Sequence, residues 1–282
     1  MEATPNAPAQ VVRAESKPAG LGRITVKNPA TGAVLGDVPI LGPDEVRAAV
    51  ARARSAQRDW ARLSVQERAR QIEGLRNVIV ERAEEIVDAL MRENGKPRIE
   101  ALVHEVLVVA DLITYLASRA PAALAPREID LHLLKHRKSY VHYAPRGVVG
   151  VISPWNFPFS IPTRDLVTAL LAGSAVVHTP AEVTPLVALK AKELFDATAM
   201  PHDLSQVVTG DGRTGAALID AGVQQIVFTG AVATGKKVAA ACGERLIPCT
   251  MELGGKAPLV VCDDADLDIA VEILGKLERN QL

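Results

Sequence analysis

Two glycine-rich segments of this chain contain the residue types that bind phosphate groups. The first, residues 210–215 (GDGRTG), fits the G-x-G-x-x-G pattern between a predicted strand and a predicted helix, the context that a dinucleotide fingerprint requires. The fingerprint also needs an acidic residue at the end of the next strand to hold the ribose hydroxyls. That strand ends in Val227-Phe228-Thr229-Gly230 and has no acid. A conventional dinucleotide site and a plain glycine-rich turn both remain open.

The second segment, residues 230–237 (GAVATGKK), matches G-x-x-x-x-G-K-[ST] at every fixed position except the last. The missing hydroxyl is the Mg²⁺ ligand, so a nucleoside triphosphatase with this loop would lack the group that holds its metal. Such an activity is therefore disfavoured. Both loops remain candidates for phosphate binding, because the N-terminus of a helix offers free amides and the positive end of a dipole.

The cysteines and histidines form no recognisable metal or disulfide pattern. Cys242, Cys249 and Cys262 make neither an even framework nor a C-x-x-C pair, which favours a reducing cytoplasm. His132 and His136 are four residues apart, but they lie in a strand-like stretch where this spacing does not converge on a metal. We therefore expect no metal site and a cytoplasmic location.

Strands and helices that could position these loops alternate from residue 148 onwards. Helices extend to residue 171 and over 186–199, 214–221 and 234–242, and the strands are 148–152, 175–177, 206–208, 225–228 and, as the last, 259–261. Strands that are apolar on both faces and separated by helices predict a parallel sheet with right-handed crossovers. The fold class is therefore α/β, a doubly wound parallel sheet that binds ligands at the carboxyl ends of its strands.

Helices and a ribbon should precede this sheet. Residues 1–22 are rich in Ala and Pro without an apolar core, which predicts a disordered leader and not a signal peptide. A turn at 28–32 should join two short strands, and helices should follow over 43–60, from the capping box at 64–67 to 94, and over 102–116. Residues 131–143 alternate like a strand before residues 145–147 (PRG) break the pattern.

The composition excludes several classes of function. The 282 residues include 48% hydrophobic and 23% charged residues, which is ordinary for a folded globular protein. A net charge of −1 gives no electrostatic reason to expect nucleic acid or an anionic membrane as partner. No apolar run approaches the roughly eighteen residues that span a bilayer.

Six motifs, taken in order, resemble the aldehyde dehydrogenase superfamily. They are PWNFP at 154–158, AGSAVV at 172–177, PAEVTP at 180–185, VTG at 208–210, FTG at 228–230 and ELGGK at 252–256. The resemblance implies cysteine attack on an aldehyde, hydride transfer to NAD(P)⁺ and hydrolysis of a thioester. It implies that Asn156 helps hold the oxyanion, and that Glu252 is the general base for the deacylating water. Without the resemblance, Asn156 could be a turn former beside prolines and Glu252 a solvated or helix-capping carboxylate.

The same resemblance implies a binding site for NAD, with NADP as the other possibility. Its cofactor-binding residues would be Ile152, Ser153, Pro154, Trp155, Thr179, Glu182, Gly212, Phe228, Thr229, Gly230, Ala231, Leu253 and Gly254. Glu182 would accept ribose hydroxyls and repel a 2′-phosphate, which tilts the expectation towards NAD. Two positions depart from the family pattern: Thr179 replaces a usual lysine, and Ala231 replaces a usual serine. The loss of two polar contacts, at about 1–1.5 kcal/mol each, would weaken cofactor binding ten- to a hundredfold.

The family nucleophile, a cysteine a little over thirty residues after the motif glutamate, has no counterpart in this sequence, and residues 273–282 do not follow the family pattern. We therefore expect residues 23–282 to form an NAD(P)-binding domain with a bridging β-ribbon at 131–144, in a truncated and inactive form without the downstream catalytic domain. Relatives are homo-oligomers, and the strand that completes their bridging sheet is absent here. The alternative is a standalone, non-catalytic module that binds NAD or a partner chain.

Overall fold

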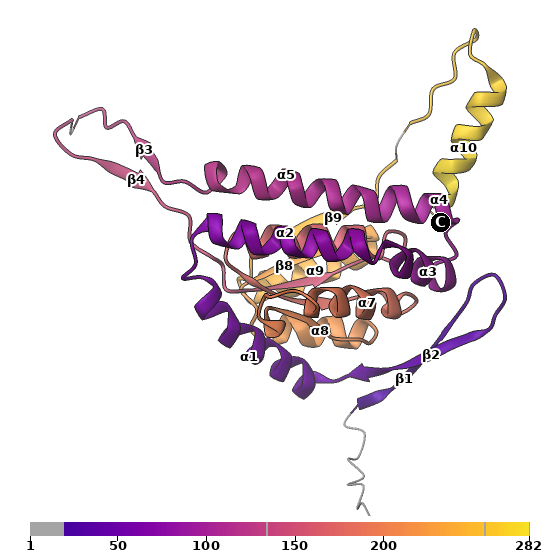
Figure 1. Ribbon diagram of the computed structural model, residues 1–282, viewed down its shortest axis with the longest axis horizontal. Helices are drawn as coiled ribbons and strands as arrows, with labels where there is room; N and C mark the ends of the chain where they lie inside the picture. Colours follow the sequence, from indigo (N-terminus) through magenta and orange to yellow (C-terminus); the bar gives the residue numbers. More distant parts are fainter. Residues whose placement is uncertain (1–19, 134, 257, 282) are drawn as a thin grey trace, which may run out of the picture.

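The protein is described by a computed structural model that covers residues 20–133, 135–256 and 258–281 (Figure 1). Residues 1–19, most of the predicted leader, lie outside the described residues. The first strand, β1, begins at Gly20, inside the range of 1–22 that we assigned to the leader.

A five-stranded parallel sheet forms the centre of the molecule, and this confirms the predicted fold class. The strand order is β7-β6-β5-β8-β9, and every neighbouring pair is parallel. The bounds are β5 Val148–Ile152, β6 Ala175–Thr179, β7 Ser205–Val207, β8 Gln225–Gly230 and β9 Cys249–Leu253. The order reverses beside β5, so β5 and β8 flank the switch point where such sheets bind ligands.

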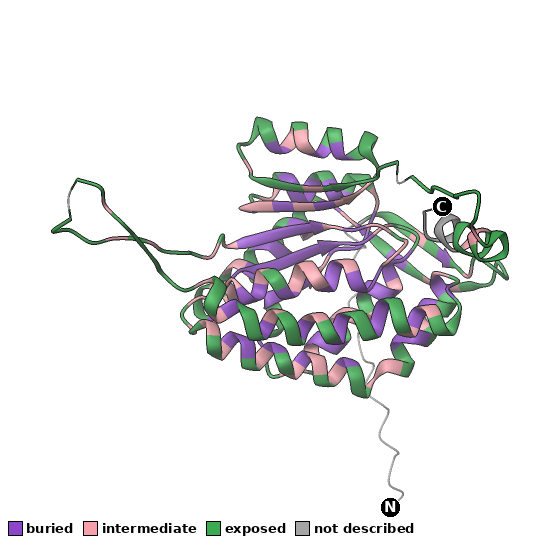
Figure 2. Cartoon of the chain, turned by 90° about the horizontal axis from the view of Figure 1, so that it is seen from above, coloured by how far each residue is buried: buried purple, intermediate pink, exposed green. Residues whose placement is uncertain are grey.

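Two sets of helices cover the two faces of this sheet (Figure 2). Helices α6 and α7 pack on one face and in turn contact α2. Helices α1, α8 and α9 contact the sheet on the other face, where α8 also contacts both α1 and α9. The bounds are α1 Pro43–Trp60, α2 Val65–Glu81, α6 Ser160–Leu171, α7 Pro185–Asp196, α8 Gly212–Asp220 and α9 Val232–Glu244. Central strands are buried on both faces because both faces are covered, and this explains their continuous apolar runs.

The N-terminal elements follow most of the sequence predictions. β1 (Gly20–Lys27) and β2 (Val34–Leu41) form an antiparallel hairpin, and α1 has the predicted bounds. The Ser64 hydroxyl and the Glu67 carboxylate cap α2 reciprocally, which confirms the capping box. The single helix predicted from there to residue 94 is wrong: α2 ends at Glu81 and α3 runs over Ala83–Glu93, because Arg82 leaves helical geometry at φ −104°, ψ 26°.

The next helix begins irregularly. A single turn, α4 (Arg98–Glu100), leads into a π-helical stretch over Ala101–Leu107 and then into α5 (Val108–Ala123). Such π-helical turns are rare and are found at functional sites more often than chance predicts. This one places the Glu105 carboxylate, buried completely, behind the loop that carries Asn156.

The predicted β-ribbon exists, but only one of its two strands, β4, lies within the predicted range of 131–144. Antiparallel strands β3 (Arg127–Ile129) and β4 (Ser139–Val141) form an arm that extends from the body of the molecule (Figure 2). The described part of 130–138 connects the two strands, so the alternation at 131–137 marks an exposed loop and not a strand. An alternation of polar and apolar residues could not by itself distinguish a loop from a strand here, because the apolar side chains of this segment do not pack on a sheet face.

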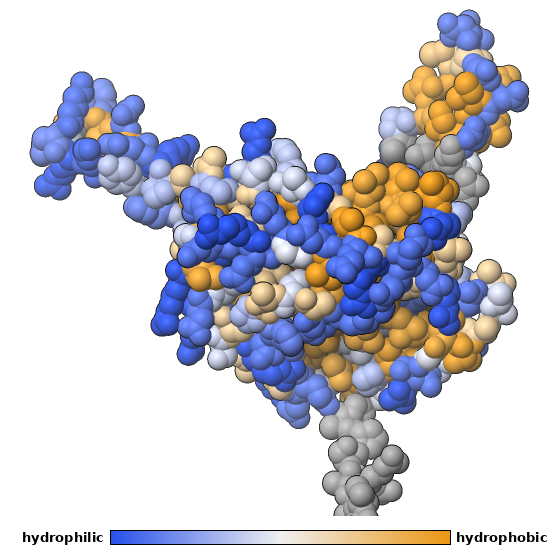
Figure 3. Space-filling model, in the orientation of Figure 1, coloured by the Kyte–Doolittle hydropathy of each residue, from blue (hydrophilic) through white to orange (hydrophobic). Residues whose placement is uncertain are grey.

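The C-terminal part also differs from the prediction. The described residues among 259–261 form no strand, and their side chains are exposed; no strand lies beside them in the described part of the chain, and an unpaired strand is marginal in water. Helix α10 (Leu267–Gln281) follows, and Asp266 caps it by accepting from the amides of Asp268 and Ile269. Apolar surface covers much of the first part of α10 (Figure 3).

Candidate functional site

A cleft of about 720 Å³ opens at the carboxyl ends of β5, β6, β8 and β9. It is lined by every residue that the sequence analysis assigned to catalysis or to the cofactor: Ile152, Ser153, Pro154, Trp155, Asn156, Thr179, Glu182, Gly212, Phe228, Thr229, Gly230, Ala231, Glu252, Leu253 and Gly254. The structure therefore brings together residues that are up to a hundred positions apart in the chain. Their individual roles remain predictions.

Strand register explains why these residues meet. Ile152 at the end of β5 pairs with Thr179 of β6 and with Phe228 of β8. Thr229 pairs in turn with Glu252 of β9. Parallel strands that end in register place their following loops at one edge of the sheet, so one cleft receives all four strand ends.

A buried ion pair holds the loop that carries Asn156. The Lys96 ammonium pairs with the Glu105 carboxylate, donates a hydrogen bond to the Asn156 carbonyl at 2.5 Å, and lies 4.0 Å from the centre of the Phe157 ring. Glu105 also accepts from the backbone amide of Ser160 at 2.7 Å. The pair thus contacts the loop in its middle, at Asn156, and at its end, at Ser160.

Asn94 adds a further contact to this loop, since its side-chain amide donates to the Trp155 carbonyl at 2.7 Å. Burial lowers the pKa of Lys96, and the charge of Glu105 opposes that change. The Glu105 carboxylate and the Asn156 carbonyl stabilise the Lys96 ammonium against this effect of burial. The Asn156 backbone is consequently held in place by the chain itself before any ligand binds.

Glu252 lies in a different setting, on the edge strand β9. Its side chain is exposed, and β9 pairs with β8 alone among the described strands. The neighbouring Leu253 packs against α9 at Gly235, where a Cβ would lie 2.5 Å from a Leu253 methyl group. Glycine at this position therefore lets α9 approach the strand closely.

A buried carboxylate near Glu252 was missed by the sequence analysis. Asp165 of α6 has a side chain only 10% exposed; one oxygen accepts from the Arg164 guanidinium at 3.0 Å, and the other has no partner in the described structure. Burial raises the pKa of Asp165, Arg164 opposes this, and the charge of Glu252 adds to the rise. No sequence motif marked this aspartate, since its burial depends on tertiary packing.

Several polar atoms in the cleft suit a dinucleotide. The hydroxyl oxygens of Thr179 and Thr229 are buried and make no hydrogen bond within the described residues, and both residues line the cleft. A buried hydroxyl without a partner is costly, so a polar ligand that reaches these two atoms would relieve that cost. The donor set fits NAD or NADP, whose ribose and phosphate oxygens accept hydrogen bonds.

The two glycine-rich loops differ in whether their helix N-termini are available. At α8 the Asp211 carboxylate accepts from the Arg213 amide at 2.9 Å and pairs with its guanidinium, so an anion already caps this helix. At α9 the N-cap is Ala231, and no side chain caps the helix. Free amides and the positive dipole end therefore favour α9 as the position of a phosphate group.

His178 lies behind the cleft on β6, and burial lowers its pKa to about 3. The imidazole is therefore neutral at physiological pH. Its Nε2 atom lies 2.7 Å from the Ser153 hydroxyl, and both side chains are buried. The contact joins β6 to the end of β5 directly below the cleft.

The cleft has further lining residues that the sequence analysis did not assign: Ile161, Pro180, Ala181, Asp211, Gly215, Thr234 and Gly255. All of them but one lie within three residues of an assigned position, so adjacency to a motif was the available signal. Ile161 is the exception, because it enters the cleft from the first turn of α6. A helical position of that kind cannot be found without the packing of α6 against β5.

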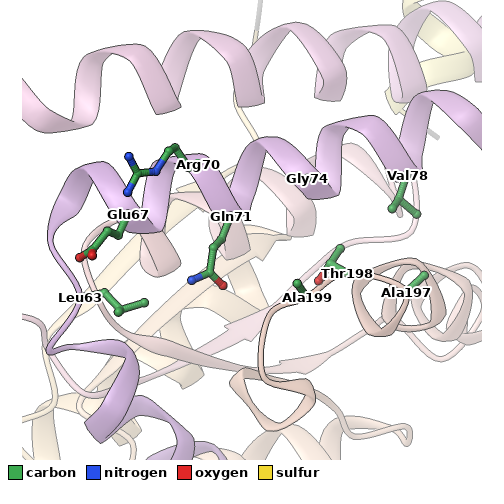
Figure 4. A pocket seen from close by; sticks show the side chains of 9 residues that line it. All are labelled: Leu63, Glu67, Arg70, Gln71, Gly74, Val78, Ala197, Thr198 and Ala199. Carbon is green, nitrogen blue, oxygen red and sulfur yellow. The ribbon is translucent and has the colours of Figure 1, made fainter.

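A second hollow, of about 640 Å³, lies between α2 and the turn after α7 (Figure 4). Its acidic residue, Glu67, is the cap of α2, and hydrogen bonds from Ser64 lower its pKa. Figure 4 shows Gln71 pointing from α2 towards Ala199, whereas Arg70 and Glu67 are directed elsewhere. The polar side chains of this hollow therefore do not converge on one point, as those of a binding site do.

The described residues contain no group of His, Cys, Asp or Glu that could hold a metal ion. Within the same residues, no helix is long and apolar enough to cross a membrane. The three cysteines are unbonded: Cys242 is buried, whereas Cys249 and Cys262 are exposed, and none of them lines the cleft.

Comparison with known proteins identifies the family of this fold and cleft. The sequence profile described as "Aldehyde dehydrogenase family" matches residues 16–277. The chain belongs to the aldehyde dehydrogenase family. It is 39% identical over 242 residues to a Mycolicibacterium smegmatis protein assigned as a succinate-semialdehyde dehydrogenase [NADP(+)], and the match covers 86% of this chain and 47% of that protein.

Solved structures of aldehyde dehydrogenases have the same fold as this chain. An Escherichia coli NADP-dependent enzyme superposes with a TM-score of 0.84 at 36% identity over 92% of this chain and 54% of that one. An NAD-dependent benzaldehyde dehydrogenase from Corynebacterium glutamicum superposes with a TM-score of 0.82 at 31% identity. The match covers 90% of this chain and 56% of that one. The chain thus spans about half the length of these relatives, and their cofactors are NAD or NADP.

Proposed function

We propose that these 282 residues form the NAD(P)-binding half of an aldehyde-oxidising dehydrogenase. One observation carries the proposal: the cleft at the carboxyl ends of the strands is lined both by the residues expected to bind a dinucleotide and by Asn156 and Glu252. Thr179 and Thr229 would hold polar atoms of the cofactor, and the first turn of α9 its phosphates. When bound, NAD(P)⁺ accepts the hydride that aldehyde oxidation releases.

Two side chains would act on the substrate. The Asn156 amide is a neutral donor on a loop fixed by Lys96 and Asn94, which suits the stabilisation of an oxyanion, because a preorganised donor needs no rearrangement as charge develops. The Glu252 carboxylate, exposed at the end of β9, would take a proton from the water that releases the acid. The substrate class is a small-molecule aldehyde; the relatives are named for two different ones.

The placement of phosphate at α9 can be tested with Ala231→Asp. An aspartate at this N-cap would copy the arrangement at α8 and stabilise the helix by about 1 kcal/mol. It would also repel the phosphates, so NAD affinity measured by isothermal titration calorimetry should fall more than tenfold. A variant that is more stable and yet binds less cofactor cannot be explained by misfolding. Unchanged affinity would contradict the placement.

Thr229→Val tests the unpartnered hydroxyl in the cleft. Removal of one hydrogen bond to the cofactor should raise its dissociation constant about fivefold, since such a bond contributes about 1 kcal/mol. Thr184→Val is the matched control, because the Thr184 hydroxyl is also buried without a partner but does not line the cleft. An equal rise of the NAD dissociation constant in the two variants would contradict the role proposed for Thr229.

We also propose that the chain by itself does not oxidise aldehydes, because none of its cysteines lines the cleft. NADH formation from an aldehyde that disappears in Glu252→Gln would overturn this statement. The free cysteines favour a cytoplasmic location.

A standalone module that binds NAD or a partner without catalysis is the second candidate. It is favoured by Thr179, which stands where relatives usually carry a lysine. Tight stoichiometric NAD binding by a monodisperse chain would support the module, and weak binding with aggregation would count against it.

A further inference from the structure

Helix α9 and strand β9 run side by side at the edge of the sheet, and their register can be read from one contact. Gly235 of α9 faces Leu253 at the end of β9. A helix that connects two parallel strands runs antiparallel to them, so the chain moves away from the cleft along α9 and returns along β9. Residues later in α9 therefore face residues earlier in β9.

This register places two cysteines opposite each other. Cys242 lies seven residues after Gly235, which is two helical turns and roughly 10 Å along α9. Cys249 lies four residues before Leu253, roughly 13 Å back along β9 and on the same face of the strand. The structure agrees with this arithmetic: α9 packs against β9, and the neighbouring Cys249 thiol contributes to the raised pKa of Cys242.

We propose that Cys242 and Cys249 form a reversible disulfide that ties the end of α9 to the start of β9. The oxidant class is a hydroperoxide. The Cys249 thiolate attacks a peroxide oxygen, the O–O bond breaks, and Cys249 becomes a sulfenic acid. The Cys242 sulfur then attacks the Cys249 sulfur, the S–O bond breaks and water leaves. Two thiols and one hydrogen peroxide give one disulfide and two waters.

The surroundings of the two thiols explain why Cys249 reacts with the peroxide first and Cys242 reacts second. Cys249 is exposed and can meet a solute peroxide, whereas Cys242 is buried completely. Burial and the neighbouring Cys249 raise the pKa of Cys242 to about 11, so Cys242 is a poor first nucleophile for peroxide. It is suited to the second step, in which the sulfenic acid is already beside it.

The edge of the sheet can accommodate the bond. Among the described strands, β9 pairs only with β8, so its first residue can move towards α9 without breaking a second ladder. The same strand carries Glu252 at its other end. The disulfide therefore fixes the strand that presents one predicted catalytic group, but its formation does not depend on the proposed function.

The test is the oxidation of the 282-residue chain with a few equivalents of hydrogen peroxide, followed by mass spectrometry. Arg245 separates the two cysteines, so trypsin yields peptides 238–245 and 246–256. We expect an intact mass lower by two hydrogens, a linked pair of these peptides, and complete reversal by dithiothreitol. The midpoint of thermal unfolding should rise by several degrees on oxidation and return on reduction.

Three variants keep the proposal falsifiable. Cys262→Ser should form the bond as the parent chain does, and Cys249→Ser should not form it. The double variant Cys249→Ser/Thr250→Cys moves the thiol to the opposite face of β9, so it should also fail to form the bond while keeping the thiol count. Oxidation that stops at a sulfenic or sulfinic acid on Cys249, a linkage to Cys262, or a disulfide between two chains would each overturn the proposal.

Discussion

The two sides of the cleft are built differently. The loop of Asn156 is held from behind by Lys96, Glu105 and Asn94, all within the described chain. Glu252, in contrast, is exposed on an edge strand, and the segment that follows it, including Val260, is also exposed.

This difference predicts that the Asn156 side of the cleft is more rigid than the Glu252 side. On the Asn156 side the Lys96–Glu105 pair is buried, and in a buried polar network every member depends on its partners. On the Glu252 side, β9 is an edge strand among the described strands, pairs only with β8 and packs on α9 at Gly235. We therefore expect substitutions behind Asn156 to cost more stability than substitutions around β9.

The largest effect should come from Lys96→Met. It leaves Glu105 buried without its counter-charge, which costs about 3–5 kcal/mol in comparable cases. The free energy of unfolding, measured in urea, should fall by this amount. The control is Glu84→Gln, which removes the exposed Arg98–Glu84 pair and should change stability by less than about 1 kcal/mol. Similar losses in the two variants would break the comparison.

A smaller effect should appear as a pH dependence on the Asn156 side. Glu93 is buried and accepts from the amides of Leu186 and Val187 at 2.7 and 2.6 Å, capping α7. Burial raises its pKa to about 7, and these hydrogen bonds oppose the rise. The folded pKa of Glu93 exceeds the unfolded value of 4.5. At a pH between these two pKa values, the folded chain therefore holds a proton on Glu93 that the unfolded chain has released.

The stability contribution of Glu93 is therefore complete below pH 4.5 and is lost as the pH rises through about 7. We expect a loss of up to about 3 kcal/mol over this range. Glu93→Gln should remove the slope, and Asp88→Asn, an exposed substitution on the same helix, should leave it unchanged. Parallel stability curves for the parent chain and Glu93→Gln would contradict the assignment.

On the β9 side, Gly235→Ala should lower stability by a smaller amount than Lys96→Met does on the Asn156 side. The added methyl group would lie 2.5 Å from Leu253, and overpacking of this kind costs about 1–3 kcal/mol. Gly243→Ala in the same helix has open space at its Cβ and should stabilise the chain by about 0.5–1 kcal/mol. Hydrogen exchange should show faster opening of β9 in Gly235→Ala only.

The smallest effect should be a gain of stability from Leu246→Gly. Leu246 is the only described residue other than glycine with a positive φ, at 53°, and its side chain is 90% exposed. It follows the C-terminus of α9, where glycine is favoured. The gain should be about 0.5–1 kcal/mol by thermal unfolding. Leu246→Ala retains the Cβ and should change little; an equal gain there would exclude backbone strain as the cause.

Much of the fold could be predicted because it depends on local patterns. The capping box of α2, the bounds of α1 and the strand at Val148–Ile152 follow from residue types within a few positions. The failures have a common cause. The break at Arg82, the loop at 131–138 and the unpaired segment at 259–261 depend on what lies beside them in space.

The sequence by itself determined the α/β class, the family and most of the residues at the cleft, because motif order and apolar runs are properties of the chain alone. Only the tertiary structure decided that α9 and not α8 offers a free N-terminus, that Lys96 and Glu105 hold the Asn156 loop, and that Cys242 faces Cys249. The physical reason is distance: capping, ion pairing and thiol contact are effective over a few ångströms, and strand register and helix packing bring those atoms together.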